Sequence, residues 1–184
     1  MITDAEIHAE RSREPNYWFN RASDLHASAG AVWYAIHNNE NDHITESIGL
    51  GAGFDLMAST WPVYLMLCGM SLELALKAVI VSRGGAPKAT HDLVLLANQA
   101  GVEVPREQEG LLLFLSECVI WAGRYPVPKK VDDLEYFTFL HYENFFVKEI
   151  NGNTTTLKPK KPYPLDWPQF QRLWNAVTEE IVPI

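Results

Sequence analysis

The chain has 184 residues, of which 47% are hydrophobic and 21% charged. These proportions are typical of one globular domain and exclude a wholly disordered chain. The formal net charge of −8 argues against broad non-specific binding to nucleic acids, although a local basic patch remains compatible with it. Cys68 and Cys118 stand singly within apolar stretches, so they form neither a disulfide framework nor a zinc-ligand pattern.

The longest uncharged run covers residues 56–72 and is slightly shorter than a usual membrane span. Because it contains Pro62, Gly69 and several hydroxyl side chains, we interpret it as a core helix and expect no membrane association. The charged N-terminal stretch lacks the apolar segment of a signal peptide. We therefore expect a cytoplasmic protein, and the residue pattern predicts no cofactor and no metal site.

Hydrophobic spacing, cap residues and turn residues predict the secondary structure. In chain order we expect a polar helix over 3–13, a helix over 16–38, a glycine-containing connector over 39–54, a helix over 56–83, a short helix over 91–100 capped by Thr90, a helix from Pro105 to Gly123, a helix over 132–143, a β-hairpin with strands 144–150 and 153–158 around Asn151-Gly152, and a final helix over 167–181. The fold class is therefore mainly α. We predict an antiparallel helical bundle over 1–128 and a C-terminal elaboration over 129–184 that packs on it without forming an independent domain.

Three motifs in the bundle contain polar or charged residues that could take part in binding or catalysis. Glu73 and Lys77 are four positions apart on the long helix, Thr-His-Asp-Leu occupies 90–93, and Arg-Tyr-Pro occupies 124–126. In this order and spacing they resemble the HEPN family (higher eukaryotes and prokaryotes nucleotide-binding), with the family-like core over about 56–128. The resemblance implies a bundle of four or five helices that is usually dimeric.

Many HEPN proteins are metal-independent ribonucleases that use an arginine and a histidine separated by four to six residues. The arginine polarises the scissile phosphate, and the histidine acts as general acid or base. In this sequence Arg124 lacks such a histidine, because the next one, His141, is seventeen positions further on. Arg21 and His26 have the family's spacing, but they lie in the early helix instead of the expected place.

Each of these residues also has a purely structural interpretation. Glu73 and Lys77 are either a surface pair worth about 0.2–0.5 kcal/mol or a partly buried network with further hydrogen bonds. His91 either caps and packs its helix or lies beside Glu73. Arg124 either interacts with the dipole of the preceding helix or faces an anion beside Tyr125.

Two basic clusters flank an aromatic-rich stretch in the second half of the chain. The clusters consist of Arg124, Lys129 and Lys130 and of Lys158, Lys160 and Lys161. Such an arrangement binds single-stranded nucleic acid in some proteins, whereas in others the aromatic residues form the core and the lysines solubilise turns. The candidate ligand-binding residues are Lys77, Asp92, Tyr125, Lys129 and Lys130.

Three hypotheses follow. The first is a homodimeric HEPN-like module that binds a protein partner and regulates a prokaryotic defence or toxin–antitoxin-type system. The second is a divergent metal-independent ribonuclease, or a nucleotide- or RNA-binding protein, in which Arg124 contacts phosphate, His91 is the acid or base and Glu73 orients His91. The third is a plain bundle outside the family. The first two predict that Glu73, His91 and Arg124 come together at one polar site, and the third predicts that they lie apart.

Overall fold

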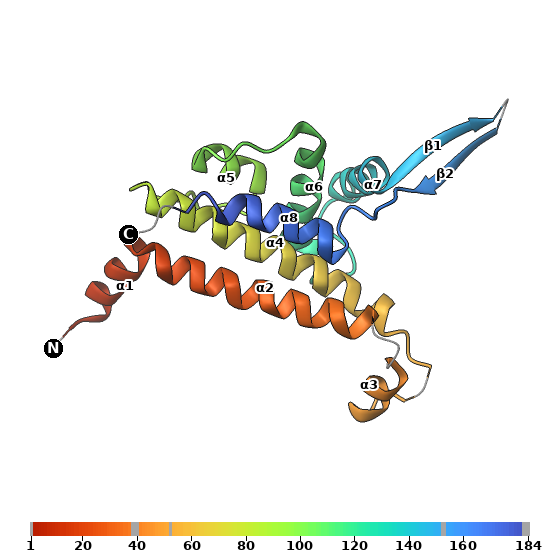
Figure 1. The fold of residues 1–184 in the computed structure, drawn as a ribbon, viewed down its shortest axis with the longest axis horizontal. Helices are drawn as coiled ribbons and strands as arrows, with labels where there is room; N and C mark the ends of the chain where they lie inside the picture. Colours follow the sequence, from red (N-terminus) through yellow and green to blue (C-terminus); the bar gives the residue numbers. More distant parts are fainter. Residues whose placement is uncertain (1, 38–40, 52, 152–153, 182–184) are drawn as a thin grey trace.

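The computed structural model describes residues 2–37, 41–51, 53–151 and 154–181. Its elements in chain order are α1 (Asp4–Arg13), α2 (Pro15–His37), α3 (Asn41–Ser47), α4 (Leu56–Ser82), α5 (Leu93–Ala100), α6 (Arg106–Glu117), the π-helical turn η1 (Cys118–Ala122), α7 (Val131–Phe145), β1 (Phe146–Asn151), β2 (Thr154–Pro159) and α8 (Trp167–Thr178). As predicted, the fold is a mainly α helical bundle with a small β-hairpin and a final helix (Figure 1).

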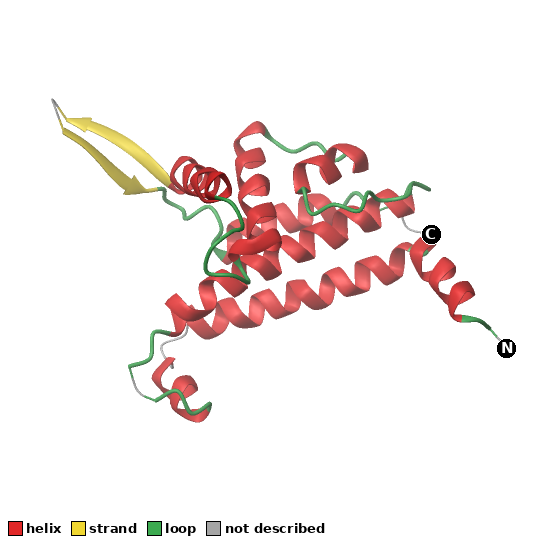
Figure 2. Ribbon diagram, turned by 180° about the vertical axis from the view of Figure 1, so that it is seen from behind, coloured by secondary structure: helices red, strands yellow, loops and turns green. Residues whose placement is uncertain are grey.

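Helix α4 occupies the centre of the bundle. Helices α2 and α4 run antiparallel side by side, and α8 lies along them (Figure 1). The shorter helices α5 and α6 and the turn η1 also pack on α4, while α7 follows and leads into the hairpin, which projects from the helical body (Figure 2). Helix α4 therefore packs against α2, α5, α6, η1 and α8.

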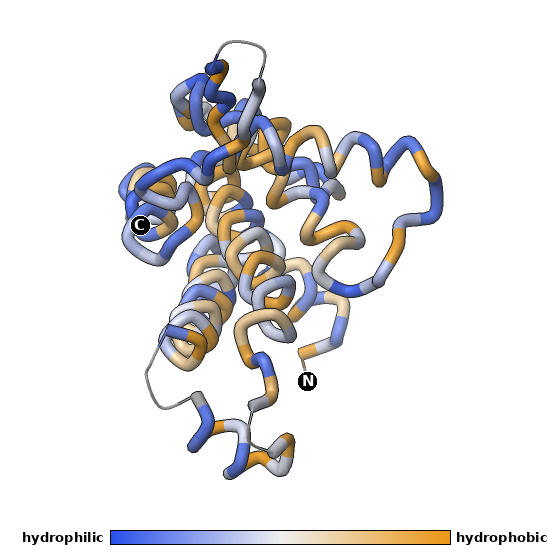
Figure 3. Tube along the Cα trace, turned by 90° about the vertical axis from the view of Figure 1, so that its right-hand side faces the viewer, coloured by the Kyte–Doolittle hydropathy of each residue, from blue (hydrophilic) through white to orange (hydrophobic). Residues whose placement is uncertain are grey.

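The sequence of α4 explains its central position. The Asp55 carboxylate caps the helix by accepting a hydrogen bond from the Ala58 N–H at 2.8 Å, and Pro62 is tolerated near the helix start. By length and composition alone α4 could cross a membrane, but 72% of its most apolar window is buried inside the protein. Figure 3 shows the hydrophobic residues gathered along the central helices. Burial against the neighbouring helices thus accounts for the apolar composition of α4.

Gly69 allows α4 to approach the turn η1 closely. A Cβ atom at this position would lie 2.6 Å from the Val119 Cγ2 atom and 2.9 Å from the Leu115 carbonyl oxygen. The second of these neighbours is backbone, which cannot move aside without shifting its helix. The glycine therefore sets the distance between α4 and the α6–η1 segment.

Helix α8 contributes one strongly apolar face to the core. Asp166 caps it by accepting from the Gln169 N–H at 3.0 Å, and the Tyr64 hydroxyl donates to the Leu165 carbonyl at 3.0 Å from the centre of α4. Four of its side chains are buried, namely Phe170, Leu173, Trp174 and Val177. The helix ends at Thr178, a little before the predicted end at residue 181.

His26 belongs to this interface between α2 and α8. Its ring stacks on Trp174 with a centroid distance of 4.3 Å, and its Nε2 lies 3.0 Å from the Gln171 Oε1 atom. Burial lowers the pKa of His26, although the hydrogen bond to Gln171 opposes this effect. Arg21 instead pairs with Asp24 on the surface at 3.5 Å. The family-like spacing of Arg21 and His26 is thus accounted for by packing.

The hairpin is formed close to the predicted position. β1 and β2 are antiparallel, with a register from Phe146 opposite Pro159 to Asn151 opposite Thr154. The first strand begins at 146 instead of 144 because α7 continues to Phe145. Gly152, the second residue of the predicted turn, lies outside the described residues.

Two local predictions are wrong. The stretch 39–54 was expected to be a connector, but its described part contains the helix α3, which is polar and therefore lacks an apolar periodicity. Thr90 was expected to cap the next helix, but the N-cap of α5 is Asp92, which accepts from the Leu95 N–H at 2.9 Å. The Thr90 hydroxyl accepts from the Asp92 N–H at 3.1 Å, so it supports the residue that makes the cap.

Candidate functional site

A buried ion pair lies on α4. The Lys77 Nζ atom donates to the Glu73 Oε1 atom at 2.6 Å, and only 11% of the Lys77 side chain and 8% of the Glu73 side chain are exposed. The pair has the favourable order of acid before base at four-residue spacing. Its burial decides between the two interpretations of the sequence, because a surface pair would leave both charges in water.

His91 completes a three-residue network with this pair. Its Nδ1 atom lies 2.8 Å from the Glu73 Oε2 atom, and 55% of the His91 side chain is exposed. The two oxygens of the buried Glu73 carboxylate therefore bind two partners, a lysine four residues later in the chain and a histidine eighteen residues later. Because the carboxylate contacts Nδ1 and the hydrogen bonds of the described residues do not use Nε2, the second ring nitrogen is free to bond another group.

The start of α5 is fixed by contacts that hold His91 in place. The Leu93 N–H donates to the buried Ser116 hydroxyl of α6 at 3.0 Å, and that hydroxyl donates to the Leu112 carbonyl at 2.8 Å. Ser116 is a positioning residue that the sequence analysis missed. Its signal is a small polar residue directly after an apolar run, where a buried hydroxyl needs a backbone partner.

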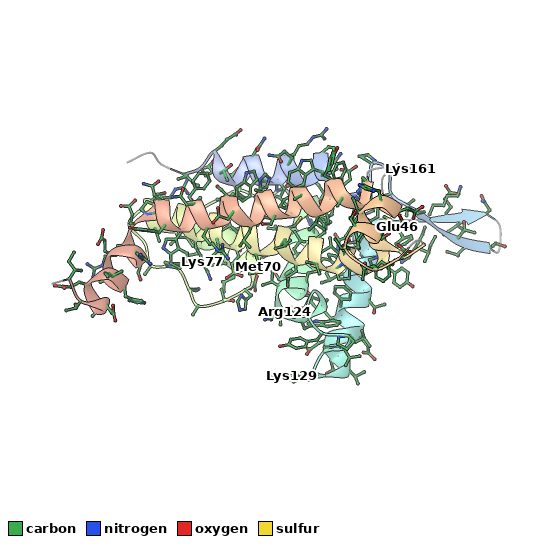
Figure 4. All side chains as sticks on the ribbon, turned by 90° about the horizontal axis from the view of Figure 1, so that it is seen from below. Glu46, Met70, Lys77, Arg124, Lys129 and Lys161 are labelled. Carbon is green, nitrogen blue, oxygen red and sulfur yellow. The ribbon has the colours of Figure 1, made fainter. Side chains whose placement is uncertain are left out.

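Arg124 has different contacts. Its guanidinium donates to the carbonyl oxygen of Ile120, one turn earlier in the chain, and lies 5.5 Å from the centre of the Tyr125 ring. Within the described part of the chain, no hydrogen bond or ion pair joins Arg124 to Glu73 or His91. In Figure 4, Met70 lies between Lys77 and Arg124 along the molecule. One copy of the chain thus brings Glu73, Lys77 and His91 together. Arg124 does not join them, so the prediction that Glu73, His91 and Arg124 meet at one polar site is wrong within a single copy.

The remaining candidate residues lie near Arg124 or at helix ends. Tyr125 and Lys129 border a hollow that they share with Arg124 and with the carboxylate of Asp133. Lys130 is exposed at the N-terminal end of α7, and Asp92 is occupied as the cap of α5. The basic cluster therefore contains an acid in its midst, which weakens its attraction for phosphates.

Glu117 adds a second acid on this side of the molecule. It accepts a hydrogen bond from the Trp121 Nε1 atom at 2.8 Å, across one turn where α6 passes into η1. Burial raises the pKa of Glu117, the hydrogen bond from Trp121 lowers it, and the nearby charge of Asp133 raises it further. Among the described residues, no group of three or more histidine, cysteine, aspartate or glutamate side chains is arranged to hold a metal ion.

The fold and the network on α4 define a helical-bundle domain built around one long buried helix. The family model of the HEPN domain matches residues 52–148, which is more than half of the chain, and the chain therefore belongs to the HEPN family. The match extends past the predicted core boundary at 128 and includes α7. No curated protein and no solved structure matches the chain. Because the family model matches, the hypothesis of a bundle outside the family is wrong. HEPN domains are generally helical domains of nucleotide- or RNA-related and defence systems.

Proposed function

We propose that this chain is a dimeric HEPN interaction module that acts as the partner or regulatory subunit of a prokaryotic defence or toxin–antitoxin-type system. The observation that carries the proposal is an exposed apolar stripe on the outer face of α7. Its exposed members are Val131, Leu134, Phe139 and Tyr142, which are three, five and three residues apart, and the polar side chains of Glu135 and Thr138 lie among them. An apolar stripe of this kind on a helix marks an interaction surface.

A second copy of the chain is the occupant that we propose for this stripe. A two-fold axis pairs the same surface with itself, so one apolar stripe suffices for both sides of the interface. Arg124 and Tyr125 lie just before α7, and the pairing of two α7 helices would place both copies of these residues at the border of the interface. The family's usual dimeric state supports the same arrangement.

The dimer is tested by light scattering coupled to size exclusion at micromolar concentration. The expected mass of the wild-type protein is twice the 20.8 kDa of one chain. Phe139→Glu places a charge in the apolar stripe and is expected to give the mass of a single chain, because an unpaired charge at the centre of an interface is costly. Tyr34→Glu is the matched control, since Tyr34 is an equally exposed aromatic residue on α2. A wild-type mass of one chain would refute the proposal.

The second candidate is a divergent metal-independent ribonuclease or RNA-binding protein, and the geometry of His91 favours it. A half-exposed imidazole whose Nδ1 is held by a buried carboxylate, and whose Nε2 is left for another partner, suits a general acid or base. Glu73 would orient His91, and Arg124 would contact a phosphate, with the second copy in the dimer supplying the closer arginine. The carboxylate of Asp133 beside Arg124, with Glu117 close enough to Asp133 for their charges to interact, makes this the less favoured candidate.

Labelled single-stranded RNA incubated with the protein in excess chelator tests this candidate. A ribonuclease of this kind would cleave, and His91→Ala would lower the rate by about 10²–10⁴-fold. Arg124→Ala would also lower it, whereas Arg172→Ala, which changes an exposed arginine of α8, would not. Cleavage that is equal in all four proteins would come from another source and would remove the enzymatic candidate.

A further inference from the structure

A cavity of about 640 Å³ opens beside the N-terminal part of α4. It lies between α4, the π-helical turn η1, α7 and the segment before α8. The network of Glu73, Lys77 and His91 does not line it, and the apolar stripe of α7 meets it at Leu134 alone. Its size is in the range of sites that enclose a small molecule. All of its lining residues belong to a single copy of the chain, so the cavity does not depend on the proposed dimer.

The walls of the cavity are formed largely by aromatic rings. Trp61 and Tyr163 meet edge to face at 5.7 Å, and Trp121 and Phe137 meet in the same way at 5.1 Å, and all four rings line the cavity. A flat ring that enters between such walls gains stacked or edge-on contacts in addition to the burial of apolar surface. An alkyl chain would gain only the burial.

The lining of the cavity carries one positive charge, that of Arg124, which also borders the adjoining hollow with the Asp133 carboxylate. Among the described residues that line it there is no carboxylate, and Arg124 supplies the one permanent charge. The guanidinium has five N–H donors, and the contact with the Ile120 carbonyl uses only part of them. One arginine balances one negative charge, so a ligand with several phosphates would leave most of its charge unpaired in an acidic protein.

Two further polar groups in the wall have no hydrogen-bond partner. Within the described residues, neither the His141 imidazole nor the Tyr163 hydroxyl makes a hydrogen bond, although both line the cavity and are partly buried. Burial lowers the pKa of His141 and raises the pKa of Tyr163, which keeps both groups neutral at pH 7. Neither side chain is fully buried, so both polar groups are free to hydrogen-bond a ligand that enters the cavity, and a few such groups in a mostly apolar wall are typical of a ligand site.

We propose that this cavity binds a small planar aromatic acid that carries a single carboxylate. The ring lies between the Trp61–Tyr163 and Trp121–Phe137 walls, and the carboxylate pairs with Arg124 at the mouth. His141, which sequence spacing placed out of reach of Arg124, lines the same cavity and supplies a second hydrogen bond to the ligand. Because η1 and α7 both line the cavity, binding of such a molecule would affect how these two elements are positioned.

Titration calorimetry with 1-naphthoate tests the assignment, with 1-naphthamide as the uncharged probe of the same shape. We expect 1-naphthoate to bind with a Kd of about 1 mM or lower, as is typical for a ligand of this size. Arg124→Gln should weaken naphthoate binding by about tenfold or more and leave naphthamide binding nearly unchanged, because only the carboxylate uses the charge-assisted hydrogen bonds. Arg172→Gln is the matched control and should change neither.

A second variant tests whether the ligand occupies the cavity, independently of the charge of Arg124. Val63→Trp fills part of the cavity from an exposed position on α4 and should abolish binding of both naphthalene probes, with the helical circular dichroism unchanged. Failure of naphthoate to bind at 5 mM, about five times the expected Kd, would overturn the proposal. Equal affinity for the two probes, or tighter binding of laurate or AMP than of naphthoate, would overturn it as well.

Discussion

Replacement of Glu73 by alanine is expected to lower the free energy of unfolding by about 3–5 kcal/mol, because it leaves the Lys77 ammonium buried without a partner. The Glu73 carboxylate is the sole side-chain acceptor for Lys77 among the described residues, and both side chains are almost fully buried. The same change also removes the partner of His91. Urea unfolding monitored by circular dichroism measures the effect.

The double variant Glu73→Leu with Lys77→Met distinguishes loss of a pair from loss of packing. A buried ion pair that is replaced by apolar residues of similar volume often costs little, so the double variant should be more stable than Glu73→Ala. Glu149→Ala is the control, because Glu149 pairs with Lys158 at 2.7 Å across the exposed hairpin and such pairs contribute about 0–1 kcal/mol. If Glu73→Ala cost no more than Glu149→Ala, the network on α4 would not be a buried one in solution.

Phe170→Ala is expected to lower the free energy of unfolding by about 3–5 kcal/mol through the cavity that it opens. Phe170 is fully buried in α8, where its ring lies 5.9 Å from the His26 ring of α2 and 5.8 Å from the Trp167 ring. Because α8 shares this core with α2 and α4, we propose that residues 129–184 fold with the bundle and not as a separate domain.

Two optical probes test this cooperativity. Far-ultraviolet circular dichroism and tryptophan fluorescence should report one common unfolding transition in the wild type and in Phe170→Ala. Arg172→Ala, on the exposed side of the same helix, should change the stability by less than about 0.5 kcal/mol. A separate early transition of part of the helical signal would show that the C-terminal segment unfolds on its own.

The course of α4 could be predicted from the sequence because several independent signals agree there. The apolar run, Pro62 near its start and Arg83 with Gly84-Gly85 after it all place the ends of the helix near 56 and 82. The hairpin was found for a similar reason, since Asn151-Gly152 and β-branched neighbours favour the same structure. Helix α3 has no such agreement, because a short polar helix and a polar connector have the same composition.

The candidate site shows the same division. The pairing of Glu73 with Lys77 follows from helix geometry, and the approach of His91 follows once the short helix α5 packs back on α4. The direction of Arg124 could not be predicted, because it depends on the π-helical turn η1, whose apolar sequence carries no mark of the wider winding. The approach of His141 to the same cavity as Arg124 requires the tertiary packing of α7 and has no signal in the spacing.

The hairpin has a consequence for how this protein can diversify. All described residues of β2 are exposed, and the ribbon is anchored near its base, where the Lys160 N–H donates to the Phe145 carbonyl and the Lys160 Nζ donates to the Glu143 carbonyl, both at 2.8 Å. Mutations along its outer length therefore leave the core untouched. The sequence of the hairpin can therefore change in evolution, and acquire new binding partners, while the fold of the helical bundle stays the same.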